Sequence, residues 1–279
     1  MTLTLVRSKP KPKTALATTA LVIAISGPTG STGKSSLALN LAYEFAELGK
    51  KTVLVDLDTY SPSISTLLGI TEPTAAITGC ARLIRQGRFD REQLDRLSVR
   101  VNYRKSSFHC LTGLASTRRW GEISQDTVTH LINLCRFEFE IVILDLASHL
   151  EDQLTSPSNP VPRNTATRVA LAQCDQAITV LNASQLSVSR YLAVFSELQE
   201  IQRNRLIVLN RSDPKPAISS ALKTLTKETI FASIPDDQAS FELSESEHLP
   251  LALARRKSPA RNAIAQLTNK LLECPPSAN

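Results

Sequence analysis

The chain has 279 residues, of which 42% are hydrophobic and 21% are charged, and its formal net charge is +6. This length and composition are those of a globular protein with a substantial core, which excludes a globally disordered chain. Aromatic residues make up only 5%, which argues against a single-stranded nucleic-acid surface built on base stacking. The five cysteines form no C-x-x-C pair, and with four scattered histidines they show no metal-ligand spacing.

The amino-terminal segment has the order of charge and hydrophobicity found in a secretory signal peptide. Four basic residues precede the apolar run Ala15–Ile25, namely Arg7, Lys9, Lys11 and Lys13. The run is too short to span a bilayer, and it continues directly into a glycine-rich segment. We therefore interpret residues 1–18 as a disordered basic tail, and residues 19–279 as a single domain of a cytoplasmic protein without a transmembrane segment.

The segment Leu21–Ser36, LVIAISGPTGSTGKSS, places a buried strand (Leu21–Ser26) before a loop of small residues and a helix after it. This order is typical of a phosphate-binding loop, in which backbone N–H groups and a helix N-terminus surround an anion. The pattern G-x-x-x-x-G-K-[ST] is met at its end, although Pro28 stands where the first glycine is expected. The predicted nucleotide-binding residues of the loop are Gly30, Ser31, Thr32, Gly33, Lys34, Ser35 and Ser36.

Lys34 and Ser35 carry the chemistry of this predicted loop. The Lys34 ammonium is expected to bind phosphate oxygens and to contribute to catalysis, and the Ser35 hydroxyl is expected to ligate Mg²⁺. The alternative is a glycine-rich turn that happens to contain a lysine, but such a turn does not need a strand before it and a helix after it. The sequence therefore predicts a nucleotide-binding protein.

Apolar runs of strand length alternate with helical patterns along the rest of the chain. A helix is predicted over Ser35–Leu48, ending before Gly49, and a buried strand over Thr52–Asp56. Further strands are predicted at Phe108–Thr112, Glu140–Asp145, Gln176–Leu181, Arg205–Asn210 and Thr229–Ile234, and further helices at Thr127–Arg136, Thr165–Ala172, Leu186–Ile201 and Arg261–Glu273. This alternation predicts the α/β class, with a doubly wound, mostly parallel sheet flanked by helices. The proline-rich loop 147–163 is long for a compact domain and is a candidate switch or lid.

Three carboxylates stand at or just after the ends of predicted strands. Asp56 ends one strand, Asp58 follows it, and Asp145 ends the strand EIVILD. Ligands of doubly wound sheets bind at the carboxyl ends of strands, so we expect these acids to converge near the phosphate loop. We predict that Asp145 holds Mg²⁺ directly or through water, that Asp56 supports the Mg²⁺ shell, and that Asp58 orients an attacking water. Each acid alone could be an ordinary turn residue.

Residues 27–70, which contain GPTGSTGKSS and VDLD, together with EIVILD, LIVLNR and SIPDD, resemble the MinD/ParA family of deviant Walker-A ATPases. Within it the likeness is greatest to CpaE-like proteins of tight-adherence pilus systems. The resemblance implies a P-loop NTPase fold of Rossmann-like type, ATP and Mg²⁺ as cofactors, and an ATP-dependent homodimer. It further implies a protein that positions or assembles a pilus, secretion, septum or chromosome-partitioning apparatus, and that is recruited to the membrane periphery or a cell pole.

The same resemblance implies roles for three residues near the end of the chain. Asn210 would hydrogen-bond the adenine edge, and Pro235 and Asp236 would line the base pocket. Each of the three could instead be an ordinary turn residue.

Thr29 departs from the family pattern, which has a signature lysine at this position. In the family, that lysine reaches the phosphates of a partner subunit, so its absence predicts weak or partner-dependent hydrolysis. Charge stabilisation of this kind is worth about 10³–10⁵ in rate in related chemistry. Arg163 and Arg168, at the end of the long loop and in the next helix, are candidates for a substitute charge.

The segment Arg82–Arg119 contains ten basic residues against three acids. Arg82, Arg85 and Arg88 recur at helical spacing, which fits either a solvated helix face or a surface for an acidic protein, an anionic membrane or non-specifically bound DNA. The apolar residues of Arg261–Glu273 resemble a membrane-targeting helix, but without a lysine-rich polar side they favour a core helix.

Two other functions remain open from the sequence. One is a small-molecule ATP-dependent enzyme of the same architecture, similar to dethiobiotin synthase, which also lacks the signature lysine. The other is a degenerate scaffold that no longer hydrolyses ATP. No second cluster of catalytic side chains for an organic substrate is evident, so the nucleotide-controlled ATPase is the preferred hypothesis.

Overall fold

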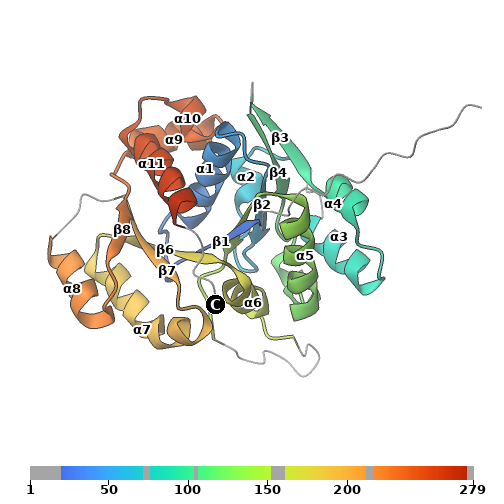
Figure 1. Cartoon of the computed structure of the whole chain (residues 1–279), viewed down its shortest axis with the longest axis horizontal. Coiled ribbons are helices and arrows are strands. Elements are labelled where there is room, and N and C mark those ends of the chain that lie inside the picture. Colours follow the sequence, from blue (N-terminus) through green and yellow to red (C-terminus); the bar gives the residue numbers. More distant parts are fainter. Residues whose placement is uncertain (1–19, 72–75, 104–105, 152–160, 212–215, 275–279) are drawn as a thin grey trace, which may run out of the picture.

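The computed structural model describes residues 20–71, 76–103, 106–151, 161–211 and 216–274, so the predicted tail lies outside the described residues. Its centre is an eight-stranded sheet in the order β3-β4-β2-β5-β1-β6-β7-β8 (Figure 1). Every neighbouring pair is parallel except β3 and β4, which are antiparallel. The strands are β1 (Leu21–Ser26), β2 (Thr52–Leu57), β3 (Val99–Tyr103), β4 (Ser106–Leu111), β5 (Ile141–Leu146), β6 (Gln176–Asn182), β7 (Arg205–Asn210) and β8 (Ile230–Ser233). The predicted fold class is confirmed.

Helices cover both faces of this sheet (Figure 1). One apolar core lies between the sheet and a first group of helices: α1 (Lys34–Glu47), α2 (Ile64–Leu67), α9 (Gln238–Ser246), α10 (Leu251–Ala254) and α11 (Pro259–Glu273). The other core lies between the sheet and a second group: α3 (Ala76–Arg85), α4 (Arg91–Leu97), α5 (Gln125–Glu138), α6 (Thr165–Gln173), α7 (Gln185–Ile201) and α8 (Pro216–Thr226). A strand enclosed between two layers needs apolar side chains on both sides, which explains the unbroken apolar runs of β1 and β5.

The carboxyl-terminal helix is a core element, as the sequence favoured. Ser258 caps α11 by accepting the amide of Arg261, and Pro259 stands in its first turn. The helix therefore begins two residues earlier than predicted. Ile264, Leu267 and Leu271 are fully or almost fully buried, so the apolar side of α11 packs against the protein.

The region between β2 and β5 differs most from the sequence prediction. The edge strand β3 was not predicted, because its side chains alternate between half-buried and exposed and include an arginine and an asparagine. The proposed helical row of arginines is also only partly correct. Helix α3 ends at Arg85, and Gly87 has φ +63°, so the chain turns and Arg88 lies beyond the helix.

Arg136 joins three parts of the fold at the amino ends of β1 and β6. Its guanidinium binds both oxygens of Asp175, at 2.7 and 2.9 Å, and the carbonyls of Ala20 and Gln173. One Asp175 oxygen also accepts the amide of Val22 at 2.7 Å. About a quarter of each side chain is exposed, so the pair is stronger than a surface pair and weaker than a fully buried one.

We expect Arg136→Ala to lower the free energy of unfolding by about 1–3 kcal/mol, because four hydrogen bonds are lost and Asp175 loses its counter-charge. Urea denaturation followed by circular dichroism measures this change. Arg203→Ala, which removes an exposed arginine just after α7, should change the value by no more than about 0.5 kcal/mol. Equal midpoints for both variants would contradict the assignment.

Candidate nucleotide-binding site

The predicted phosphate loop connects β1 to α1 at the carboxyl end of the central strand. Gly33 is the N-cap of α1 with φ +83°, in the left-handed region. A Cβ at this position would clash with the side-chain amide of Asn210. Both observations require glycine here, and they place the start of the helix where the sequence motif predicts it.

Three side chains from β6, α7 and β7 hold the carbonyl groups of the loop. Arg190 donates to the carbonyl of Thr29 at 3.0 Å, Asn182 to that of Ser31 at 3.4 Å, and Asn210 to that of Thr32 at 2.8 Å. In a planar trans peptide the carbonyl and the next N–H point in opposite directions. The loop amides that follow these carbonyls are therefore turned away from the three donors. In this conformation the Thr32 amide donates to the carbonyl of Gly30 at 2.9 Å.

Lys34 points toward the end of the neighbouring strand β5. Its Nζ donates to the hydroxyl of Ser148 at 2.7 Å, which is the second residue after β5. The bond joins the phosphate loop to the start of the long loop 147–163, the predicted switch. Residues 152–160 of that loop lie outside the described residues, whereas Leu150 is buried in the core.

Asp145 is completely buried, and neither of its carboxylate oxygens has a hydrogen-bond partner in the described structure. Burial raises the pKa of this carboxyl to about 7, while the neighbouring Ser35 hydroxyl and Lys34 ammonium lower it in part. A buried carboxylate without a partner is costly unless a cation compensates it. Carboxylate and hydroxyl oxygens are the protein ligands that Mg²⁺ prefers. The Ser35 and Asp145 pair therefore fits the predicted Mg²⁺ site.

Asp56 lies opposite Asp145 in the register of β2 and β5. Its oxygens accept the backbone amides of Asp58, Ser63 and Ile64 at 3.1–3.2 Å. Burial and the nearby Asp145 charge raise the pKa of Asp56 well above its usual value. The visible role of Asp56 is to shape the loop that follows β2, and its place in a Mg²⁺ shell stays a prediction.

Asp58 stands in the loop after β2. Tyr60 of the same loop stacks with two side chains from the loop after β5. One Asp58 oxygen accepts the amides of Tyr60 and Ser61 at 2.8 and 2.9 Å. The Tyr60 ring lies between the imidazole of His149 and the guanidinium of Arg163. The centroids of the Tyr60 and His149 rings are 4.1 Å apart, and Cζ of Arg163 is 3.8 Å from the Tyr60 centroid. The loops after β2 and β5 are thus packed together beside the phosphate loop. The water-orienting role of Asp58 stays a prediction.

The two arginines proposed as a substitute charge are engaged in this neighbourhood. Arg163 stacks on Tyr60 and donates to the carbonyl of Thr59 at 3.3 Å. Arg168 binds Glu197 on α7 and the carbonyl of Leu150. These contacts do not support the hypothesis that either side chain reaches the phosphates.

The predicted base-binding residues lie at the ends of β7 and β8, on the side of the phosphate loop away from Asp145. Asn210 ends β7, and its buried Oδ1 has no partner among the described residues, which leaves an acceptor suited to an exocyclic amine. Next to it a cavity of about 380 Å³ is lined by Asp236 and by Arg211, Gln238, Phe241, Glu242 and Glu245. Pro235 is half-buried just before Asp236. The structure thus brings the base-binding candidates to one end of the loop.

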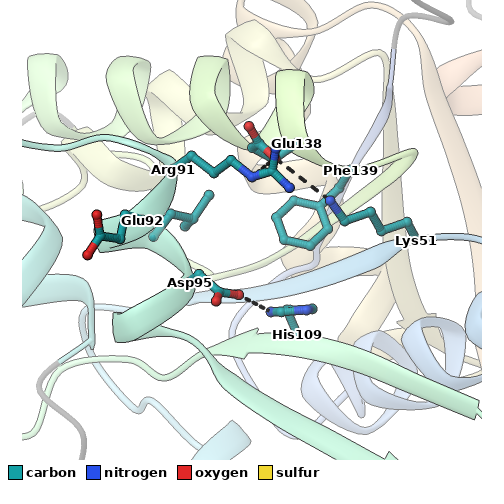
Figure 2. Close-up of a pocket in the computed structure, with 8 residues that line it drawn as sticks. Lys51, Arg91, Glu92, Asp95, His109, Glu138 and Phe139 are labelled. Carbon is teal, nitrogen blue, oxygen red and sulfur yellow. Dashed lines mark ion pairs between the residues drawn. The ribbon is translucent and has the colours of Figure 1, made fainter. Parts of the chain in front are cut away.

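A second cavity, of about 420 Å³, lies near the amino ends of β2 and β5 (Figure 2). The phosphate loop lies at the carboxyl ends of the strands, at the opposite edge of the sheet. Lys51 and Arg91 both pair with Glu138, at 3.7 and 3.1 Å, and Asp95 lies 3.9 Å from the imidazole of His109 (Figure 2). Burial lowers the pKa of His109. No motif in the sequence indicates this cavity, and its charges largely pair with one another.

The predicted basic surface is formed where α3 packs beside the short helix η1 (Thr117–Glu122). Exposed arginines gather there from three segments: Arg82, Arg85, Arg88, Arg118 and Arg119. Glu122 pairs with Arg85 at 3.9 Å and with Arg119 at 2.6 Å, which leaves an excess of positive charge. None of the helices in the described ranges is long and apolar enough to cross a bilayer.

Sequence reasoning missed Asn182, Ser148 and Arg190. Asn182 ends β6 as Asp145 nearly ends β5, so the same strand-end rule would have found it. Ser148 and Arg190 have no local signal, because their contacts with the loop span 114 and 161 residues of sequence.

A profile of the CobQ/CobB/MinD/ParA nucleotide-binding domains matches residues 23–251. This range covers the phosphate loop, all three predicted acids and both base-side segments. Most of the described sheet is included in it as well.

Comparisons with individual proteins agree with this fold. The structure of a ParA-family ATPase from Chlorobium tepidum has a TM-score of 0.76 at 18% identity and covers 89% of this chain and 98% of that one. The septum site-determining protein MinD of Pyrococcus horikoshii, solved with Mg-ADP, has a TM-score of 0.69 at 18% identity, with 90% and 96% covered. The iron–sulfur cluster carrier protein of Aquifex aeolicus is 38% identical over 63 residues, which is 23% of this chain but only 17% of that protein's length.

Proposed function

Because the chain belongs to the family of CobQ/CobB/MinD/ParA nucleotide-binding domains, we propose that it binds ATP with Mg²⁺ and acts as a nucleotide-controlled switch. The observation that carries the proposal is the meeting of Lys34, Ser35 and the unpaired Asp145 at the carboxyl edge of the sheet. A lysine, a hydroxyl and a buried acid at a phosphate loop are the groups that a nucleotide triphosphate and its metal require. This arrangement has no equally simple structural explanation, since the acid is fully buried and its Ser35 and Lys34 neighbours compensate its charge only in part.

Different residues of the site bind the phosphates, the Mg²⁺ and the adenine. The amides of Gly30–Ser36 and the N-terminus of α1 surround the phosphates, and Lys34 exchanges the Ser148 hydroxyl for phosphate oxygens. Ser35 and Asp145 hold the Mg²⁺, which neutralises phosphate charge when bound. Asn210, with Pro235 and Asp236 beside it, receives the adenine.

The contacts around Lys34 support a switch. Its bond to Ser148 breaks when the lysine turns to a phosphate, and the neighbouring His149 stacks on Tyr60, whose amide Asp58 holds. Nucleotide binding at one loop is therefore transmitted to two others. We propose that these loops form the face of an ATP-dependent homodimer.

The proposed cellular role is to position or assemble an apparatus such as a pilus, a secretion system, a septum or a partitioning chromosome. The proteins of similar structure include a septum site-determining protein and a ParA-family ATPase, and the CpaE-like pattern of the sequence favours the pilus. The arginines of α3 and η1 provide a docking surface for an acidic protein partner. The protein is expected in the cytoplasm or at the membrane periphery.

Light scattering tests this proposal. We expect a mass of 30.5 kDa without nucleotide and with ADP, and twice that mass only with ATP and Mg²⁺. Hydrolysis by the purified protein should be slow, since Thr29 offers no charge to the partner. A mass that no nucleotide changes would contradict the switch and favour a scaffold or a small-molecule enzyme.

A further inference from the structure

Arg190, in the second turn of α7, lies against the outer rim of the phosphate loop. Its Nη1 is 3.0 Å from the carbonyl oxygen of Thr29. A Cβ placed on Gly30 would stand 2.7 Å from the same nitrogen. The guanidinium therefore touches the Thr29 carbonyl and occupies the space into which a side chain at position 30 would project. A cavity of about 110 Å³ separates the loop from the start of α7, and it is lined by residues 29–32 and by Asn182, Ser184, Leu186, Ser187 and Arg190.

The surroundings of Arg190 leave its charge available. The carbonyl of Thr29 is a neutral acceptor, and no ion pair joins Arg190 to a carboxylate in the part of the chain that the structure describes. Arg168, by contrast, is paired with Glu197. Arg190 is exposed, so its side chain can leave Thr29 without opening the core. An unpaired guanidinium at the rim of a loop of small residues is suited to an anionic group with several oxygens.

We propose that Arg190 binds the terminal phosphate of ATP held in its own phosphate loop and supplies the positive charge that Thr29 does not. The inference rests on the proposed ATP binding. The terminal phosphate carries the charge that ADP lacks, and charge spreads over its oxygens during transfer. An arginine that moves from the Thr29 carbonyl to this phosphate stabilises bound ATP and the transition state more than it stabilises bound ADP.

The competing explanation is that Arg190 only orients the loop through the Thr29 carbonyl. The amides of the loop serve ADP and ATP alike, so a positioning role affects both nucleotides equally. A neutral donor would also preserve it. Discrimination between ATP and ADP, together with the need for charge, separates the two explanations.

The experiment compares Arg190→Ala, Arg190→Gln and Arg190→Lys by titration calorimetry with ATP-Mg²⁺ and with ADP-Mg²⁺. We expect Ala and Gln to weaken ATP binding by roughly tenfold or more and ADP binding by less than about twofold, since one charge-assisted contact is lost. Lys should retain most of the ATP affinity. Single-turnover hydrolysis should fall in Ala and Gln and recover in Lys.

Arg203→Ala is the matched control, because it removes one exposed positive charge just beyond the other end of α7 and should change neither affinity. Wild-type behaviour of Arg190→Gln, or an equal loss for ATP and ADP, would overturn the inference while leaving the proposed function intact. A wild-type protein that binds neither nucleotide would overturn both.

Discussion

Lys34→Ala is expected to weaken ATP binding roughly tenfold to a hundredfold, because one charge-assisted contact to phosphate contributes about 1.5–3 kcal/mol. In the described structure the Lys34 ammonium donates to the Ser148 hydroxyl, on a loop beside the site, so the substitution should leave the fold unchanged. Titration calorimetry with ATP-Mg²⁺ measures the affinity, and thermal unfolding verifies the fold.

Lys223→Ala is the control for this experiment, since it removes an exposed lysine on α8. Equal affinities of the Lys34 variant and the wild type would mean that residues 27–34 form a turn and not a phosphate loop. Loss of ATP-induced dimerisation in the Lys34 variant, with the Lys223 variant unaffected, would also link the switch to this site.

Asp145→Asn is expected to have two opposite effects. It should abolish most of the Mg²⁺ dependence of ATP affinity, because the predicted metal ligand is lost. It should also raise the melting temperature of the nucleotide-free protein measured in EDTA, because the wild-type carboxylate is buried without a partner. Few substitutions at a structural position stabilise a protein while removing its ligand response.

The stabilising effect of Asp145→Asn should depend on pH. The pKa of Asp145 is raised from 3.8 to about 7 in the folded protein, so the folded state holds a proton that the unfolded state releases above pH 4. The contribution of Asp145 to the free energy of unfolding of the wild type is therefore fully present below about pH 4, and it is lost as the pH rises through about 7. The advantage of the variant should grow over the same window. Loss of the Asp145 charge also removes one of the causes that raise the pKa of Asp56. Ionisation of Asp56 therefore destabilises the variant less than the wild type as the pH rises.

A difference in melting temperature between the variant and the wild type that stays constant from pH 4 to pH 8 would show that the pKa of Asp145 is not raised in the folded protein. An unchanged Mg²⁺ dependence of ATP binding would show that β5 does not carry the metal ligand. Glu200→Gln, an exposed charge removal on α7, is the control for both measurements.

The sequence by itself determined the elements whose signal is local. The buried strands around Ala24 and Ile143 can be predicted because a strand covered on both faces must be apolar throughout. The phosphate loop can be predicted because glycines and a lysine at fixed spacing set the backbone and the charge together. The place of Asp145 near the carboxyl end of β5 can be predicted from the apolar run before it, whereas its role as a metal ligand stays a prediction. These parts need only the order of residues in one segment.

The tertiary structure alone decided which distant side chains meet. The edge strand β3 forms because β4 offers it a partner, and not because VRVNY is a strong strand sequence. Arg163 stacks on Tyr60 instead of facing the phosphates, whereas Arg190, from a helix more than 150 residues beyond the loop in sequence, touches Thr29. Such contacts depend on how whole helices pack on the sheet, and the packing is set by many small apolar contacts summed over the core. This packing decides where a polar side chain lies, so the residues next to it in sequence do not indicate which residue it contacts.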